Sequence, residues 1–141
     1  MKKNQIKTFD VDQSKIRIDN YLSLKIDTNH GGKIISILDK KNYTEWVWFK
    51  KNKQESFKPK KFSDYDSQWI GGYEELYPND KVEEFDGIKA PDHGELWPVS
   101  WNVLNKCENN VELFCKGYFT NSLIFKNIIL DGKKITVKYK I

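Results

Sequence analysis

The sequence contains a single arginine, Arg17, among its 24 basic residues. Arginine is the side chain that binds phosphates and guanine edges in a bidentate manner, so its near absence argues against specific recognition of nucleic acid. The net charge of +4 is carried by lysines, which we expect on solvated strand faces and turns. No apolar run approaches the roughly 20 residues that a membrane-spanning helix needs. We therefore expect neither a nucleic-acid partner nor a membrane partner.

Cysteine is also scarce, with only Cys107 and Cys115. The N-terminus lacks the apolar core of a secretory signal peptide, so we expect a cytoplasmic, reducing compartment and two buried free thiols. The two cysteines flank an Asn109-Asn110 turn, across which they could face each other in a hairpin. No Cys and His spacing fits a zinc site, and neither a phosphate-binding glycine loop nor a Gly-x-Ser-x-Gly elbow occurs. We expect no metal.

Most of the chain alternates apolar and polar residues with period two, which predicts β-strands. The turns between them carry glycine and asparagine, above all Asp131-Gly132, a strong hairpin signal. We take His30, beside Gly31 in another such turn, as solvent-facing. The strands are predicted at 16–26 (bent near Asn20), 33–38, 45–49, 101–104, 111–118, 122–130 and 134–141. The chain is thus predicted to be all-β, a single domain over 1–141, forming an antiparallel β-sandwich.

Two stretches interrupt this pattern. Residues 50–61 are polar and aperiodic, which favours a solvated loop. Residues 62–101 form a second, longer loop region, and between 62 and 95 it holds ten acidic residues against two lysines. Such a loop, mounted on a β scaffold, is where a functional site is expected.

Within this region, residues 69–101 contain four of the eight glycines and three of the five tryptophans. Aromatic faces together with carboxylates suit a ligand that is apolar on one face and hydroxylated at its rim, which describes a sugar. The candidate sugar-binding residues are Trp69, Tyr73, Glu75, Asp92, Glu95 and Trp97. Trp97 and Trp101 could equally cap the core.

His93 is the candidate catalytic residue. It stands between Asp92 and Gly94, where glycine lets the backbone approach a ligand closely. Histidine is the natural proton donor or acceptor near neutral pH. The alternative is that it has a structural role in an acidic loop.

Three segments carry a family resemblance. The run 20–48, NYLSLKIDTNHGGKIISILDKKNYTEWVW, resembles the opening hairpins of the aldose 1-epimerase, or galactose mutarotase-like, family. Segments 71–78, GGYEELYP, and 91–97, PDHGELW, are similar to that family's two site-proximal segments and follow in the same order. The resemblance extends from about residue 16 to residue 141.

The resemblance implies a β-supersandwich fold and interconversion of the α and β anomers of an aldose, a hexose ligand and no cofactor. In that family a glutamate takes the proton of the anomeric hydroxyl and a histidine protonates the ring oxygen. His93 matches the histidine of the first His-Gly segment, and Glu75 and Trp97 match residues that line the pocket.

The sequence also departs from the family pattern. The family's catalytic glutamate and second histidine come from a later half, and an arginine near the sugar has no counterpart. The last strand stops in mid-alternation at Ile141, so we expect an incomplete supersandwich, inactive or weakly active. Its unpaired edge strand could associate with a second copy or with a missing C-terminal half.

Two functions of other classes remain open. The first is a sugar-binding module without chemistry, in which the tryptophans and acids of 69–101 hold a glycan. The second is an interaction module whose acidic loop docks on a basic partner, a contact that salt would weaken.

Overall fold

The computed structural model describes residues 15–50 and 59–141, and statements below concern those residues. Nearly all of the regular structure in this part of the chain is β. The strands are β1 (Lys15–Asp19), β2 (Leu22–Asp27), β3 (Lys33–Asp39), β4 (Thr44–Glu45), β5 (Glu84–Phe85), β6 (Ile88–Lys89), β7 (Asn102–Lys106), β8 (Asn110–Lys116), β9 (Leu123–Asp131) and β10 (Lys134–Lys140), with one short helix, α1 (Tyr65–Gln68).

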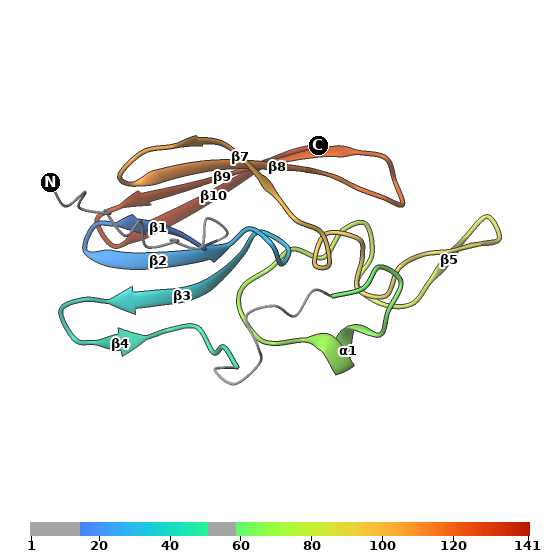
Figure 1. Ribbon diagram of the computed structural model, residues 1–141, viewed down its shortest axis with the longest axis horizontal. Helices are drawn as coiled ribbons and strands as arrows, with labels where there is room; N and C mark the ends of the chain where they lie inside the picture. Colours follow the sequence, from blue (N-terminus) through green and yellow to red (C-terminus); the bar gives the residue numbers. More distant parts are fainter. Residues whose placement is uncertain (1–14, 51–58) are drawn as a thin grey trace, which may run out of the picture.

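Two four-stranded antiparallel sheets face each other. One has the strand order β1-β2-β3-β4 and the other β10-β9-β8-β7. In Figure 1 the second sheet lies over the first, and the loop region that contains α1 and β5 lies to one side of both. The predicted all-β antiparallel sandwich is therefore confirmed.

The predicted strand at 16–26 is a hairpin of two strands, β1 and β2. The chain turns at Asn20, whose side-chain Oδ1 accepts the Tyr21 N–H at 2.9 Å. Ile16 pairs with Ile26 and Ile18 with Leu24. This register pairs even positions with even positions, so both strands present their apolar residues to the same face. The alternation of apolar and polar residues therefore continues through the turn, so periodicity alone could not reveal that 16–26 forms two paired strands.

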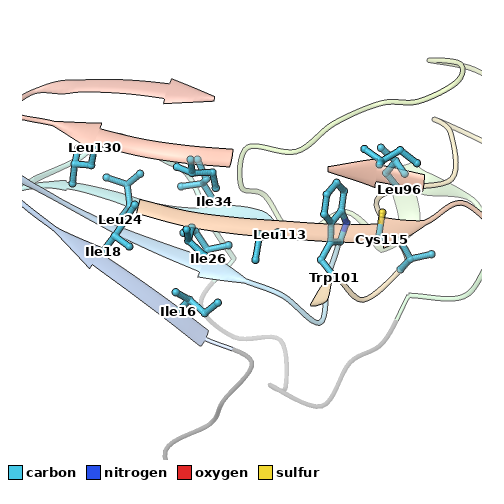
Figure 2. Packing of buried hydrophobic residues seen from close by; sticks show 14 of the residues in the cluster. Ile16, Ile18, Leu24, Ile26, Ile34, Leu96, Trp101, Leu113, Cys115 and Leu130 are labelled. Carbon is cyan, nitrogen blue, oxygen red and sulfur yellow. The ribbon is translucent and has the colours of Figure 1, made fainter. Parts of the chain in front are cut away.

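The apolar face of each sheet is buried against the other. Most of the cluster comes from the even positions of β1–β3 and from alternate positions of β8 and β9, and three residues from 96–101 extend it. Figure 2 shows Leu113 and Ile26 within it, with Trp101 and Cys115 toward the loop region. The members are Ile16, Ile18, Leu22, Leu24, Ile26, Ile34, Leu96, Val99, Trp101, Val111, Leu113, Cys115, Ile124, Ile128 and Leu130.

The third predicted strand, at 45–49, is shorter than expected. Only Thr44–Glu45 pairs regularly with β3. Beyond it the backbone leaves the sheet and pairs with the loop region, where Phe49 bridges to Gly71. The Lys50 N–H donates to the Ile70 carbonyl at 2.8 Å. The tertiary partner, not the local alternation, thus decides the path of 46–50. Residues 51–58 of the predicted 50–61 loop lie outside the described residues.

The later strands agree closely with prediction. β8, β9 and β10 coincide with the predicted ranges within one or two residues at most boundaries. β7 begins at Asn102, one residue later than expected, because the Trp101 N–H donates to the Thr28 carbonyl at 2.7 Å and pairing with β8 starts only at Asn102. β10 is one of the two outer strands of its sheet, and β7 is the other.

His30 is buried, so the prediction that it faces solvent is wrong. Its Nδ1 lies 2.8 Å from Asp27 Oδ2, and Lys15 contacts the same carboxylate. The turn is covered from outside by the loop region, because the Gly31 N–H donates to the Val99 carbonyl at 2.9 Å. A turn signal cannot indicate that another segment will pack on it.

The two cysteines are free thiols in different surroundings. Cys115 is buried as predicted, and burial, followed by the nearby Glu95 and Glu75 carboxylates, raises the pKa of its thiol to about 12. Cys107 is exposed, so the prediction for it is wrong. The two do not face each other, since Cys115 pairs with Ile124 of β9 while the Cys107 N–H bonds to Asn110 at the turn.

Candidate functional site

His93 lies at a fixed turn in the loop region. Its backbone has a positive φ of 55°, and Gly94 follows at 78°. A Cβ on Gly94 would lie 2.3 Å from the Tyr77 carbonyl oxygen, so glycine is required here for close approach of the chain to itself. His93 Nδ1 lies 2.8 Å from Asp92 Oδ1, and the side chain keeps 26% of its surface exposed. The ring is therefore held by a carboxylate and remains accessible.

Tyr65, the first residue of α1, forms the other side of this site. Its ring stacks on His93 with 4.2 Å between centroids and 14° between planes. Its N–H donates to Asp92 Oδ2 at 2.9 Å. Asp64 caps the helix by accepting the Ser67 N–H. One carboxylate, Asp92, thus binds both the histidine ring and the start of the helix that carries the stacked tyrosine.

Trp97 completes the cluster on its buried side. It is buried, and its ring meets Tyr65 edge-on, with 5.3 Å between centroids and 84° between planes. Its indole N–H donates to the Asp92 carbonyl at 2.9 Å. Of the predicted site residues, Asp92, His93 and Trp97 are therefore brought together.

The electrostatics of the cluster favour an ionised Asp92. Burial by itself would raise the pKa of this carboxyl, but hydrogen bonds from the Tyr65 N–H and from His93 outweigh that effect and hold the pKa below its usual value. Burial, together with a hydrogen bond to Glu74, raises the pKa of the Tyr65 hydroxyl. At neutral pH His93 consequently faces a carboxylate and a neutral phenol ring.

The Tyr65 hydroxyl joins the cluster to the sandwich. It donates to Glu74 Oε1 at 2.7 Å, and Glu74 Oε2 lies 2.7 Å from Lys33 Nζ. Both members of this ion pair are almost fully buried. Because Lys33 opens β3, Tyr65 connects the first sheet to His93, with its hydroxyl on Glu74 and its N–H on Asp92.

Glu75 points to the second sheet instead. Its Oε1 lies 2.6 Å from Lys126 Nζ and accepts the Tyr139 hydroxyl at 2.5 Å. Lys126 is fully buried on β9, where burial lowers the pKa of its ammonium group. Adjacent residues of an extended segment project to opposite sides, so Glu74 and Glu75 each bind a lysine of a different sheet. Their segment is thereby fastened across the end of the sandwich.

The remaining predicted residues lie apart from the cluster. Glu95 is fully buried, and its carboxylate accepts the N–H groups of Phe119 and Thr120 and the Thr120 hydroxyl. A Cβ on Gly117 would lie 2.3 Å from Glu95 Oε1. Glu95 therefore fixes the turn at 117–120 and is not presented to a ligand.

Tyr73 and Trp69 are exposed. The Tyr73 backbone bridges to Ile34, and its side chain borders an open cleft of about 370 Å³ shared with Glu75, Leu76 and Tyr139. Trp69 directly follows α1 and stacks on Trp48.

A smaller hollow lies beside the histidine cluster. It measures about 260 Å³ and is bordered by polar groups of Ser63, Asp64, Lys89 and Asp92, with apolar surface from Phe62, Val82, Ala90 and Pro91. Among the described residues, no group of three His, Cys, Asp or Glu side chains is arranged to hold a metal ion. None of their helices is long and apolar enough to cross a membrane.

Sequence reasoning missed Tyr65 and the lysine partners Lys33 and Lys126. The segment 64–68 carries an N-cap aspartate, a signal for a helix start, but one turn of helix leaves no periodicity to read. Lys126 stands between Ile124 and Ile128 on the buried face of β9, where alternation indicates burial, whereas Lys33 opens β3 directly after a turn, where a lysine ordinarily reaches solvent. Their burial follows from the two glutamates that arrive from a distant segment.

Among known proteins, the likeness of this chain lies in its fold. No protein-family model matches the sequence, and no curated protein matches it either. Among solved structures, a galactose mutarotase-like protein from Lactobacillus casei matches with a TM-score of 0.65 and 16% sequence identity. The fold is that of part of a galactose mutarotase-like protein. The match covers 89% of this chain but only 42% of the solved one.

At the level of fold, the predicted resemblance is thus confirmed. At 16% identity, the match establishes the fold alone.

Proposed function

We propose that this chain is an aldose 1-epimerase-like protein that binds a hexose against the cluster of Tyr65, Asp92, His93 and Trp97. The observation that carries the proposal is the His93 ring, held by Asp92 at Nδ1, stacked on Tyr65 and still partly exposed. Among the described residues its Nε2 has no hydrogen-bond partner. A fixed imidazole with one free nitrogen suits proton exchange with a hydroxylated ligand.

The proposed chemistry is ring opening and closure of the sugar. A base removes the proton of the anomeric hydroxyl, the C1–O5 bond breaks, and His93 donates a proton to O5. The aldehyde then rotates about the C1–C2 bond, and O5 attacks C1 from either face. As the ring recloses, the proton on O5 returns to His93 and the base returns its proton to the anomeric oxygen. This chain supports the acid role at His93, and the buried Trp97 behind Tyr65 would keep the cluster rigid.

The acids that could serve as the catalytic base are already engaged in other contacts, so we expect slow turnover or binding alone. The four acids of the two motif segments are all engaged. Asp92 holds His93, Glu74 and Glu75 bind buried lysines, and Glu95 fixes a turn. A carboxylate that is already paired is a poor base. A carbohydrate-binding module without chemistry is therefore the second candidate for the same cluster.

Binding and chemistry can be separated in one set of samples. Titration of glucose and of galactose, followed by NMR shifts of the His93 ring protons, measures binding. Polarimetry of freshly dissolved α-anomers measures the rate of equilibration.

We expect His93→Ala to abolish any acceleration and to weaken binding, and Tyr65→Phe, which keeps the ring but loses the hydroxyl, to change binding little. If neither hexose shifts the His93 resonances, the proposed site is refuted. Acceleration that survives His93→Ala would refute the role of His93 alone.

The acidic part of the loop region favours a further candidate, a protein-interaction module. β5 and β6 form a two-stranded hairpin whose residues are all exposed, including Phe85, Ile88 and Glu84. Figure 1 shows β5 projecting away from the sandwich. A basic partner captured by this hairpin should be released as salt is raised from about 0.05 to 0.5 M.

We propose that β10 pairs with a further strand through its outer edge. β10 is terminal in its sheet, and Tyr139 and Ile141 are exposed. An uncovered strand edge recruits another strand, from a second copy or from the remainder of a longer mutarotase-like fold. A mass that stays monomeric in sedimentation up to high concentration would contradict self-association.

A further inference from the structure

Two tryptophans far apart in the sequence form an exposed stack. Trp48 and Trp69 lie with 5.4 Å between ring centroids and 22° between planes. Their exposed fractions are 62% and 41%. Exposed apolar surface that is gathered in one place, unlike single scattered residues, is typical of interaction sites.

The stack is fixed by the backbone beneath it. The Gly72 N–H donates to the Trp48 carbonyl at 2.9 Å, and Phe49 bridges to Gly71. Gly71 has a φ of 90°, and a Cβ there would lie 2.3 Å from the Trp48 carbonyl oxygen and 2.7 Å from its ring atom Cε3. Only glycine allows this approach, so the position of the Trp48 ring depends on a residue of the loop region.

The stack is also joined to the histidine cluster through the backbone of α1. The Trp69 N–H donates to the Tyr65 carbonyl at 2.8 Å, across the single turn of α1. Trp69 is the C-cap residue of this helix and has extended backbone angles. Tyr65 stacks on His93. The Trp48–Trp69 stack is therefore fixed, through the backbone of Trp69, to the residue that stacks on His93.

We propose that the Trp48–Trp69 stack is a second sugar subsite, so that the ligand of this chain is a saccharide of two or more units. One unit would lie at His93, and the next would place its C–H face on the exposed indoles. Indole faces suit this role because a pyranose is apolar on its faces and polar at its rim. The proposal rests on the proposed function and extends the same site.

Comparison of monosaccharides with disaccharides tests the proposal. Glucose and galactose would be titrated against the whole chain beside maltose and lactose, with affinity followed by NMR. We expect at least one disaccharide to bind about fivefold or more tightly than its component hexoses, in line with the strength of aromatic stacking. Trp48→Ala should remove that advantage and leave hexose affinity within about twofold, because Trp48 belongs to the distal subsite.

Trp46→Ala is the matched control. Trp46 is two residues earlier and 69% exposed, but among the described residues it stacks on no other ring. It should change neither affinity. Trp48→Phe, which keeps an aromatic face, should retain part of the disaccharide advantage. Thermal unfolding of each variant shows whether the fold persists.

The outcomes distinguish the two proposals. If hexoses bind at His93 but no disaccharide binds more tightly, or if Trp48→Ala leaves the advantage intact, the second subsite is refuted and the proposed function stands. If no sugar of either size binds, the proposed function fails, and the subsite fails with it.

Discussion

The sandwich and the loop region are held in place by different interactions. The sandwich buries a continuous apolar cluster between its sheets. The loop region 62–101 adds three residues to that cluster and is fastened in addition by specific polar groups: Glu74 on Lys33, Glu75 on Lys126, Glu95 on the turn at 117–120, and Asp92 on Tyr65 and His93. Apolar burial is non-directional and tolerates exchange of similar side chains. Buried polar contacts fix one geometry and fail when one partner is lost.

The largest expected effect is at the junction of the two regions. Lys126→Met should lower the free energy of unfolding by about 3–5 kcal/mol, because it leaves the Glu75 carboxylate buried without its cation. Urea unfolding measures the loss, and Glu75→Gln added to Lys126→Met should recover part of it. Lys138→Met on the exposed face of neighbouring β10 is the control, with a change within about 0.5 kcal/mol. Equal stability of Lys126→Met and wild type would contradict a buried pair.

A second effect should arise inside the loop region. Glu95→Ala should cost about 1–3 kcal/mol, since the N–H groups of Phe119 and Thr120 would lose their acceptor. Hydrogen exchange should also quicken at these two amides while the amides of β2 stay protected. Uniform quickening across the chain would show that the loop region and the sandwich unfold as one unit.

The sandwich should respond more weakly to a small truncation of an apolar side chain. Ile26→Val removes one methylene from the fully buried core and should cost about 0.5–1.5 kcal/mol without loss of cooperativity. Chemical denaturation monitored by tryptophan fluorescence provides the value. A larger cost than that of Glu95→Ala would reverse the proposed contrast between the two regions.

The smallest effect concerns pH. Because the folded pKa of Asp92 is depressed, its contribution is fully present above its ordinary pKa of about 3.9 and is lost as pH falls through the folded pKa. Asp92→Asn should therefore be less stable than wild type at pH 7 by about 0.2–1 kcal/mol. The difference should vanish at the lowest pH that the fold tolerates. If the difference in stability between Asp92→Asn and wild type is constant across the acid range, it arises from altered packing and not from the lost charge.

Prediction from sequence succeeded where the signal was local. Alternation located β8, β9 and β10, and the Asp131-Gly132 turn joined the last two. At 16–26 it placed a bend near Asn20 correctly but missed the hairpin, which a register of even with even positions hid, and it failed at 45–49, where pairing with Gly71 replaced the sheet. His30 and Cys107 show the same limit, because exposure of a turn depends on what packs over it.

For the candidate site, the sequence brought three of the gathered residues to attention, Asp92, His93 and Trp97, because they share one short segment. It could not supply Tyr65, whose helix is a single turn, or Lys33 and Lys126, which reach the loop region from separate sheets. The sequence by itself determined the strand pattern, since alternation and turn residues act over a few positions. Only the tertiary structure decided which carboxylates are engaged and which aromatic faces remain exposed, because these depend on contacts between segments tens of residues apart.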